Sequence, residues 1–310
     1  MSDQIQCTLS ENALDYLLLA GEQVQTGEQR MLKHAIATLA DGIELLLKAR
    51  LEFYDWSLLF KDVDKVEKTK FECGDFQSVT VDQAIKRLKN ICGVSFDHHS
   101  FPMLTQLRKL RNRIRHFAVS VESAQAQSMI ANAYSFAIDF IAEELKPNSK
   151  DDLEFEVSDL RKLLGEFSGF VDQRMKDIKE TLESQKYASH IQCPACLQET
   201  LYPEGDNVVC AFCNFRTDGE SAAHLWADEN MPQSLSDSLI APVVRPCPEC
   251  GSKACIPAGE ESATSYSHVC LKCAESGDYT DCSRCGGLCS VDSAGYMCGD
   301  CRDSIMSKWD

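Results

Sequence analysis

The chain has 310 residues, with 48 acidic and 31 basic side chains and a formal net charge of −17. So acidic a balance excludes a protein that coats nucleic acid with positive charge, and any contact with phosphates must be local. Hydrophobic residues make up 44% of the chain. That fraction is enough for a buried core, and a chain of this length is expected to form two or more domains.

The composition also indicates the compartment. No apolar run approaches the roughly 18 residues that span a bilayer, and the acidic start, Met1-Ser2-Asp3-Gln4, lacks the basic region of a signal peptide. We therefore expect a cytoplasmic protein. Of its 17 cysteines, 14 follow residue 190, and twelve of these form six Cys-x-x-Cys pairs. In a reducing compartment such pairs bind metal more often than they form disulfides.

Apolar residues at spacings of three and four predict four helices before residue 146. They cover residues 31–54, about 81–91, about 102–117 and about 123–145. Gly93 is a suitable stop for the second helix, and Pro102 fits the first turn of the third. The connections are short and no segment alternates apolar and polar residues. Residues 1–146 are therefore predicted to be an all-helical bundle.

Two further segments connect the bundle to the cysteine-rich region. Apolar positions from Leu153 to Leu182 follow a near-heptad spacing, which predicts a connecting helix within residues 147–190. Gly165 and Gly169 weaken an isolated coiled coil, so a surface helix packed on the bundle is the alternative. Residues 217–244 are polar and contain prolines, and we interpret them as a linker with some helix around residues 224–227.

The paired cysteines predict three zinc ribbons, at residues 191–216, 245–276 and 277–310. Each ribbon has two Cys-x-x-Cys turns, and two such turns at the ends of a short hairpin complete a tetrahedron around Zn²⁺ at about 2.3 Å per bond. Four thiolates leave no position for water, which favours structural zinc over catalytic zinc. The predicted ligands are Cys193, Cys196, Cys210 and Cys213; Cys247, Cys250, Cys270 and Cys273; and Cys282, Cys285, Cys298 and Cys301.

The pairing of the last two sets stays open at the level of sequence. Sequential ribbons compete with a cross-braced arrangement in which Cys247 and Cys250 join Cys282 and Cys285. Cys255 and Cys289 are left over, and His268 is expected to be a surface residue. From residue 150 onward there are 14 basic and 28 acidic residues, so the ribbons are expected to repel phosphates and to serve protein recognition or sensing.

The third predicted helix carries a basic stretch, residues 108–116, with five cations and a histidine. On a helical wheel, its buried face consists of Leu107, Leu110, Ile114 and Phe117. Asn112 and His116 are one turn apart on the opposite side, and Arg111 lies at the edge of the apolar face. Without further information, a solvated basic face is an ordinary explanation of such a stretch.

Residues 111–116, Arg-Asn-Arg-Ile-Arg-His, resemble the Arg-polar-x-x-x-His signature of the HEPN nucleases, which are all-helical domains. The earlier segment 42–48, Gly-Ile-Glu-Leu-Leu-Leu-Lys, is similar to the long, Glu-bearing helix of that family. The resemblance covers roughly residues 28–145. It implies a HEPN-like bundle that cleaves RNA without a metal ion, in a homodimer whose two motifs face each other across one composite site.

The resemblance also implies roles for individual residues. His116 is expected to act as acid and base, Arg111 to hold the phosphate, Asn112 to orient His116 or a phosphate oxygen, and Glu44 to be a polar helper. The RNA-binding residues are then expected to be Arg108, Lys109, Arg113 and Arg115.

The resemblance implies a toxin or antiviral-defence effector as the biological role. The sequence departs from one branch of the family, in which a tyrosine two positions after the histidine accepts a nucleotidyl group, because that position is Ala118. The competing hypothesis is a non-catalytic dimeric adaptor or nucleotide-binding module whose ribbons dock proteins.

Overall fold

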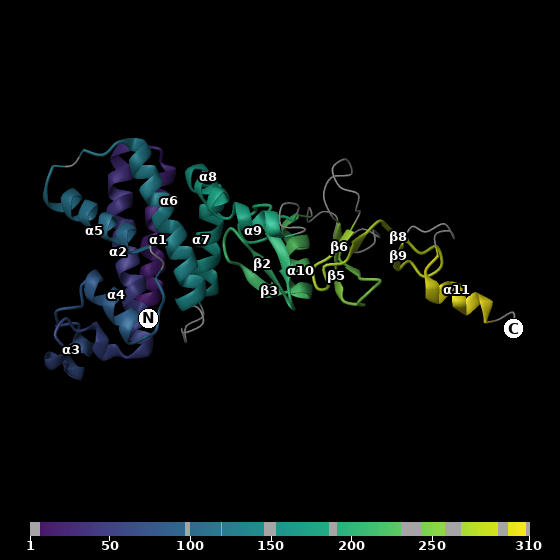
Figure 1. Ribbon diagram of the computed structural model, residues 1–310, viewed down its shortest axis with the longest axis horizontal. Helices are drawn as coiled ribbons and strands as arrows, with labels where there is room; N and C mark the ends of the chain where they lie inside the picture. The colour runs from purple at the N-terminus through teal and green to yellow at the C-terminus, as the bar shows by residue number, and fades with distance from the viewer. Residues whose placement is uncertain are drawn as a thin grey trace, which may run out of the picture. The chain divides into compact units, whose positions relative to one another are not determined.

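The computed structural model describes residues 7–96, 100–118, 120–145, 153–185, 191–230, 243–257, 268–290 and 297–307. The chain divides into two compact units, Met1–Asp177 and Ile178–Asp310 (Figure 1). Within the described ranges, no helix combines the length and the apolar character needed to cross a membrane.

The first unit is helical, as the sequence predicts. Its helices are α1 (Leu9–Gln25), α2 (Gln29–Tyr54), α3 (Lys68–Cys73), α4 (Val81–Asn90), α5 (Ser100–His116), α6 (Ser123–Phe140), α7 (Glu154–Glu166) and α8 (Ser168–Asp177). Short 3₁₀ turns, η1 (Trp56–Leu59) and η2 (Val63–Lys65), follow α2, and a π-helical turn, η3 (Ile141–Leu145), extends α6. The four helices predicted from apolar spacing correspond to α2, α4, α5 and α6 with its π turn.

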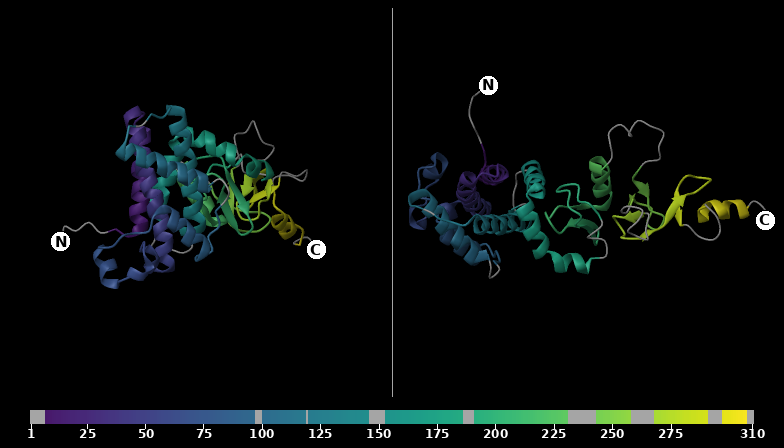
Figure 2. Two further views of the ribbon diagram at one scale, coloured as in Figure 1. Left: turned by 60° about the vertical axis from the view of Figure 1, so that its left-hand side comes forward. Right: turned by 90° about the horizontal axis from the view of Figure 1, so that it is seen from above.

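Helices α1 and α2 pack along each other and form the centre of this unit (Figures 1 and 2). The sequence analysis missed α1, although Thr8 and Glu11 form a complete capping box at its start. The two helices approach closely at Gly42, where a Cβ atom would lie 3.0 Å from a methyl carbon of Leu17 and 3.3 Å from the carbonyl oxygen of Ala13. A side chain at position 42 would therefore push the Leu17 side chain and the α1 backbone slightly away from α2.

The segment expected to be one connecting helix is broken into three. Helix α7 ends at Glu166, because Phe167 has an extended backbone, and α8 gives way after Asp177 to a short α9 (Lys179–Ser184). Helix α7 packs on α1, and α8 packs on α6, where Phe170 is fully buried against Tyr134. Helices α7 and α8 therefore match the alternative interpretation, in which this segment packs on the bundle as surface helices. Residues 147–152 and 186–190 lie outside the described ranges.

The second unit contains three small antiparallel sheets. The first has the order β1 (Leu201–Glu204), β2 (Asn207–Cys210), β3 (Arg216–Asp218); the second has β4 (Arg245–Pro246), β5 (Lys253–Pro257), β6 (His268–Cys270), β7 (Ser276–Gly277); the third pairs β8 (Tyr279–Asp281) with β9 (Leu288–Ser290). Two helices, α10 (Gly219–Asn230) and α11 (Gly299–Met306), complete the unit.

The interpretation of residues 217–244 as a linker is wrong for their first half. Residues 219–230 form α10, three times the length of the helix expected there, and residues 231–242 lie outside the described ranges. Helix α10 packs against β5 of the second sheet. At its first residue, Gly219, a Cβ atom would lie 2.7 Å from the Cα of Lys272, so the helix contacts the second sheet backbone to backbone. The first two sheets are thus joined by a packed helix.

Candidate metal centres and basic helix

The twelve paired cysteines gather into three groups of four, in sequential order along the chain. The groups are Cys193, Cys196, Cys210 and Cys213; Cys247, Cys250, Cys270 and Cys273; and Cys282, Cys285, Cys298 and Cys301. Within each group all sulfur atoms lie within 4.8 Å of one another. The Cys-x-x-Cys pairs are therefore grouped in sequential order, and the cross-braced arrangement of Cys247 and Cys250 with Cys282 and Cys285 is not formed.

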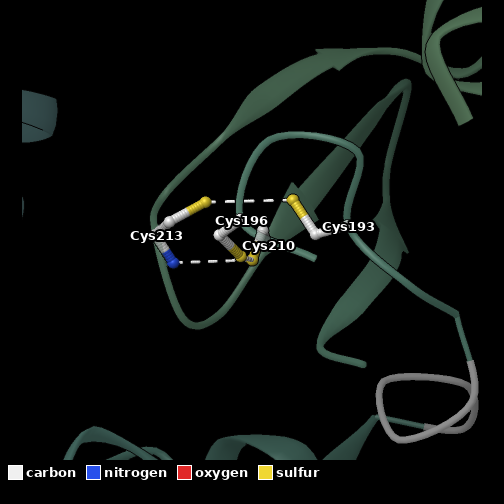
Figure 3. A group of neighbouring side chains, drawn as sticks. All are labelled: Cys193, Cys196, Cys210 and Cys213. Carbon is white, nitrogen blue, oxygen red and sulfur yellow. Dashed lines mark hydrogen bonds between the residues drawn. The ribbon is translucent and has the colours of Figure 1, made fainter. Parts of the chain in front are cut away.

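The spacing of the sulfur atoms fits a tetrahedral ion. Figure 3 shows the four side chains of the first group pointing toward one another from two turns. The Sγ atoms of Cys193 and Cys213 are 3.8 Å apart, and those of Cys196 and Cys210 are 3.7 Å apart. Four sulfurs at about 2.3 Å from one centre would be about 3.8 Å apart. The other two groups contain sulfur pairs at 3.7 Å as well.

Five of the six Cys-x-x-Cys turns share one backbone pattern, which we call the knuckle. The residue after the second cysteine has a left-handed backbone in each: Leu197, Asn214, Gly251, Ala274 and Gly286. Its N–H donates to the carbonyl oxygen of the first cysteine, as from Leu197 to Cys193 at 2.9 Å and from Gly251 to Cys247 at 2.9 Å. The knuckle turns both thiols of a pair to one side. The sixth turn instead begins α11, with Cys298 at its N-terminal boundary.

Three of the thiols are set up to ionise, which metal binding requires. Burial opposes ionisation of Cys210, but hydrogen bonds with the other thiols of its group and with Thr200 outweigh it and lower the pKa of Cys210. Burial opposes ionisation of Cys250, but hydrogen bonds with Ser252 and the neighbouring thiols outweigh it and lower the pKa of Cys250 to about 6. Backbone N–H groups, including that of Cys298, lower the pKa of Cys282 to about 6.

The three groups differ in burial. All four cysteines of the first group are buried. In the second group Cys250 is exposed, and in the third only Cys282 is buried. Solvent therefore reaches the third group most easily.

The remaining residues singled out in this region do not join the groups. Burial raises the pKa of Cys255 to about 12, so this thiol is a neutral part of the core around β5. Cys289 is also buried, and its Sγ lies 3.5 Å from the carbonyl oxygen of Thr280. His268 is half-buried in β6 next to Tyr279 rather than on the surface, and burial lowers its pKa.

In the helical unit, α5 has one apolar face that is buried against the bundle and one polar face that is exposed to solvent. Leu104, Leu107 and Leu110 are buried against the bundle. Phe117 was expected on this face, but α5 ends at His116 and the Phe117 side chain is 74% exposed. The chain leaves the helical path there, so the wheel no longer describes residue 117.

The outer face of α5 carries four exposed polar residues one turn apart: Lys109, Asn112, Arg113 and His116. Helical geometry places positions 109, 112, 113 and 116 on one stripe. The His116 ring contacts the ring of the adjacent Phe117, and neither Lys109 nor Arg113 has an ion-pair partner among the described residues. These groups are accessible from solvent.

Arg111, by contrast, faces α2. Its Nε and one terminal nitrogen donate to Asp41 Oδ1 at 2.8 and 2.5 Å, and Arg115 donates to the other oxygen of the same carboxylate. Glu44 Oε2 lies 3.8 Å from the Arg111 guanidinium, while Glu44 Oε1 accepts a 2.7 Å hydrogen bond from Lys48. Two arginines of α5 thus bind a carboxylate of α2 that is 11% exposed, and Glu44 and Lys48 extend this network along α2.

Sequence reasoning did not single out Asp41, which is the centre of this network. Its signal was present: Asp41, Glu44 and Lys48 form a polar stripe at helical spacing on a helix that is otherwise largely apolar. Arg108 is held differently, by an ion pair to Asp82 at 2.7 Å.

The structure does not bring Arg111 and His116 together within one chain. Five residues along an α-helix correspond to about 140° around its axis, so the two side chains leave α5 on different sides. Arg111 Nη1 does lie 3.5 Å from Asn112 Oδ1, which connects the inner network to the outer face.

No family model, curated protein or solved structure matches this chain.

Proposed function

We propose that the helical unit is a metal-independent endoribonuclease of the HEPN type, acting as a toxin or defence effector. The observation that carries the proposal is the outer face of α5, where exposed His116 stands one turn from Asn112 and beside the cation Arg113, while Arg111 is fixed by a buried carboxylate. An exposed imidazole on a cationic stripe of a strongly acidic protein suits RNA, because the local charge attracts phosphates.

The chemistry uses the 2′-hydroxyl of the RNA itself. His116 takes the proton of the 2′-OH, whose oxygen attacks the adjacent phosphorus; the bond from phosphorus to the 5′-oxygen of the next nucleotide breaks, and that oxygen takes the proton back from the imidazolium of His116. A histidine suits this task because its unperturbed pKa of about 6.5 lies near neutrality. The products are a 2′,3′-cyclic phosphate and a 5′-hydroxyl, and no external oxidant or metal ion is required.

Arg111 stabilises the additional negative charge on the phosphate. Asp41 engages the Nε and one terminal nitrogen, and the N–H groups of Nη1 are then oriented for a phosphate oxygen. Asn112 accepts from this same nitrogen, and its amide N–H groups can hold a second oxygen. Asp41 is therefore a positioning residue.

A homodimer accounts for the separation of Arg111 and His116. The two residues leave α5 on different sides, so the outer face of a second copy would supply the complementary half of a composite site. Dimerisation through the helical unit is consistent with the exposed Phe117 at the end of α5.

We further propose that each cysteine group holds one structural zinc ion. Zn²⁺ is the common partner of four thiolates in tetrahedral geometry, and the sulfur spacings match its bond length. The ribbon unit is acidic, and each zinc with four thiolates adds two further negative charges. It is therefore proposed to recognise a protein partner or trigger rather than the RNA.

The decisive test is incubation of the purified full-length protein with total RNA in EDTA, for times over which the helical unit stays folded by circular dichroism. We expect cleavage, and His116→Ala should reduce its rate by about 10²- to 10⁴-fold, which is the usual contribution of acid–base catalysis. His224→Ala, an exposed histidine on α10, is the matched control and should cleave like the wild type.

The alternative, a non-catalytic adaptor, is favoured by one observation: Arg111 and Arg115 neutralise a buried carboxylate, which is also a sufficient structural reason for both arginines. If His116→Ala cleaves RNA as fast as the wild type, the nuclease proposal fails and the adaptor takes its place.

A further inference from the structure

The third cysteine group is the most open of the three. In the first group, drawn in Figure 3, all four cysteines are buried. In the third group Cys285 is exposed, Cys298 and Cys301 are half-buried, and only Cys282 is buried. A thiolate reacts with a dissolved oxidant only when the oxidant reaches its sulfur atom. The burial of the cysteines therefore predicts that the third group is oxidised before the first.

The third group is also the least constrained by strand pairing. One cysteine of the first group, Cys210, lies in β2 and pairs with Leu201 of β1. In the second group Cys270 lies in β6 and pairs with β5. No cysteine of the third group lies in a strand, because Cys282 and Cys285 fall between β8 and β9 and the other two lie at and within α11.

Two sulfur atoms of the third group are close enough to form a disulfide after a small movement. Cys285 Sγ lies 3.7 Å from Cys298 Sγ. A disulfide bond is about 2.05 Å long, so the two atoms must approach each other by about 1.7 Å. Neither residue has to leave a strand ladder for this approach.

Helix α11 depends on the third group because it has no core of its own. None of its residues is buried, whereas α10 buries Gly219 and two alanines. Its last turn carries Ile305 and Met306, which are 37% and 67% exposed. A helix of eight residues with nothing buried is not stable by itself. A metal ion held by Cys298 and Cys301 would therefore be what keeps α11 folded on its ribbon.

We propose that the third cysteine group is an oxidation-sensitive zinc centre, which releases its ion and frees α11 when a peroxide oxidises Cys285. The inference rests on the proposed zinc ions and is independent of the nuclease. It deepens the proposal that the ribbon unit responds to a trigger, because it names the chemical class of that trigger.

The reaction is a two-electron oxidation of two thiolates. The Cys285 thiolate attacks one oxygen of hydrogen peroxide, the O–O bond breaks, and a sulfenic acid and a hydroxide ion form. The Cys298 thiolate then attacks the sulfenic sulfur, so that the S–S bond forms, the S–O bond breaks and a second hydroxide leaves. Two protons from solvent convert both hydroxides to water. Cys282 and Cys301 provide only half of a tetrahedral site, and the zinc ion leaves.

The test is oxidation of the full-length, zinc-loaded protein with hydrogen peroxide. A chromogenic chelator follows zinc release, and mass spectrometry maps the disulfides formed at each time. The ion of the third group should leave at least about tenfold faster than that of the first, and Cys285–Cys298 should be the first disulfide. The first group is the internal control, because Cys196 Sγ and Cys210 Sγ are also 3.7 Å apart but buried.

Two variants separate the attacking thiolate from exposure in general. Cys285→His keeps a zinc ligand at this position but removes the thiolate, so the first ion should leave more slowly than in the wild type. Cys73→Ser removes an exposed thiol that belongs to no group, and its zinc release should equal that of the wild type. If Cys285→His binds only two ions, the order of disulfides in the wild type decides the question.

Amide hydrogen exchange reports on α11 itself. Oxidation should raise exchange in residues 299–306 by at least about tenfold and leave α10 unchanged. Unchanged exchange in α11 after zinc release would refute its dependence on the metal.

Two other results would overturn the assignment: a first disulfide within the buried first group, or a three-ion Cys285→His variant that releases zinc as fast as the wild type. Three ions that leave at one rate would refute this inference alone. A protein that binds no zinc would refute the metal proposal, and this inference with it.

Discussion

The two units of this chain bury their interiors by different means. The four longest helices of the first unit have 17 to 26 residues and bury leucine, isoleucine and alanine side chains against one another. The strands of the second unit have two to five residues, and buried cysteines form a large part of their interior. A helical core stabilises itself, whereas we expect strands this short to need a bound metal ion that supplies folding free energy.

The two units also differ in how often one local backbone structure recurs. In the helical unit each contact occurs once, such as the close approach at Gly42 or the two arginines that bind Asp41. In the ribbon unit one backbone pattern, the knuckle, recurs five times with different residues at its left-handed position. A turn that only has to place two thiols on one side accepts different residues at its left-handed position, whereas a packed helical core accepts fewer changes.

The largest expected difference between the two units follows from the loss of one predicted metal ligand. Cys196→Ser should unfold the first ribbon and lower the metal content by about one ion per chain, because zinc contributes about 10–16 kcal/mol to the folding of such modules. The helical signal in circular dichroism should be largely unchanged. Cys255→Ser is the matched control, since Cys255 is buried but belongs to no group. Equal metal loss in both variants would contradict the assigned ligands.

How far the sequence could predict the molecule also differs between the units. The twelve candidate ligands follow from spacing alone, because a Cys-x-x-Cys turn places two thiols on one side, and the same twelve cysteines form the three groups in the structure. Pairing could not be settled from spacing, since it depends on which turns the hairpins bring together. The full length of α10 was missed as well, because its N-terminal contact at Gly219 is with a backbone more than fifty residues away.

In the helical unit, periodicity identified the apolar faces but not the polar contacts between them. Asp41 and Arg111 are 70 positions apart and meet only because α2 and α5 pack together. A wheel places Arg111 at the edge of the apolar face, which is where it lies, but the wheel cannot name its partner. The wheel was wrong about Phe117, because it assumes that the helix continues to residue 117, whereas α5 ends at His116.

The second prediction tests the core of the helical unit. Leu46 on α2 is fully buried, and Leu46→Ala should reduce the free energy of unfolding by about 2–5 kcal/mol through lost burial and the cavity it leaves. Leu19→Ala removes the same atoms at a position that is 43% exposed, and it should cost far less. Denaturant titration followed by helical signal measures both. Metal content should stay constant, and a variant that also releases zinc would show that the units unfold together.

The third prediction concerns the Asp41 network. Asp41→Asn leaves two arginines facing a neutral amide that can accept fewer hydrogen bonds, and we expect a loss of about 1–3 kcal/mol in the free energy of unfolding. Asp82→Asn breaks the exposed pair with Arg108 and should change stability by at most about 1 kcal/mol. RNA cleavage should fall in the first variant and not in the second. Equal effects of the two substitutions would mean that Asp41 does not position Arg111.

The smallest predicted effect is a change in the stability of the second ribbon, whose two knuckles have different residues at the left-handed position. Gly251 and Ala274 occupy equivalent left-handed positions, with φ of 74° and 60°. That backbone costs a residue with a Cβ roughly 1–2 kcal/mol, partly offset by the greater freedom of glycine in the unfolded chain, about 0.5–1 kcal/mol.

Gly251→Ala should therefore weaken, and Ala274→Gly strengthen, the second ribbon by about 0.5–1 kcal/mol each. A Cβ at position 251 would meet no atom within 4 Å, so backbone strain is the only difference being tested there. Competition for zinc against a chelator of known affinity should show shifts of opposite sign, each about two- to fivefold. Shifts of the same sign would mean that contacts of the side chain, and not the left-handed turn, set the stability of the knuckle.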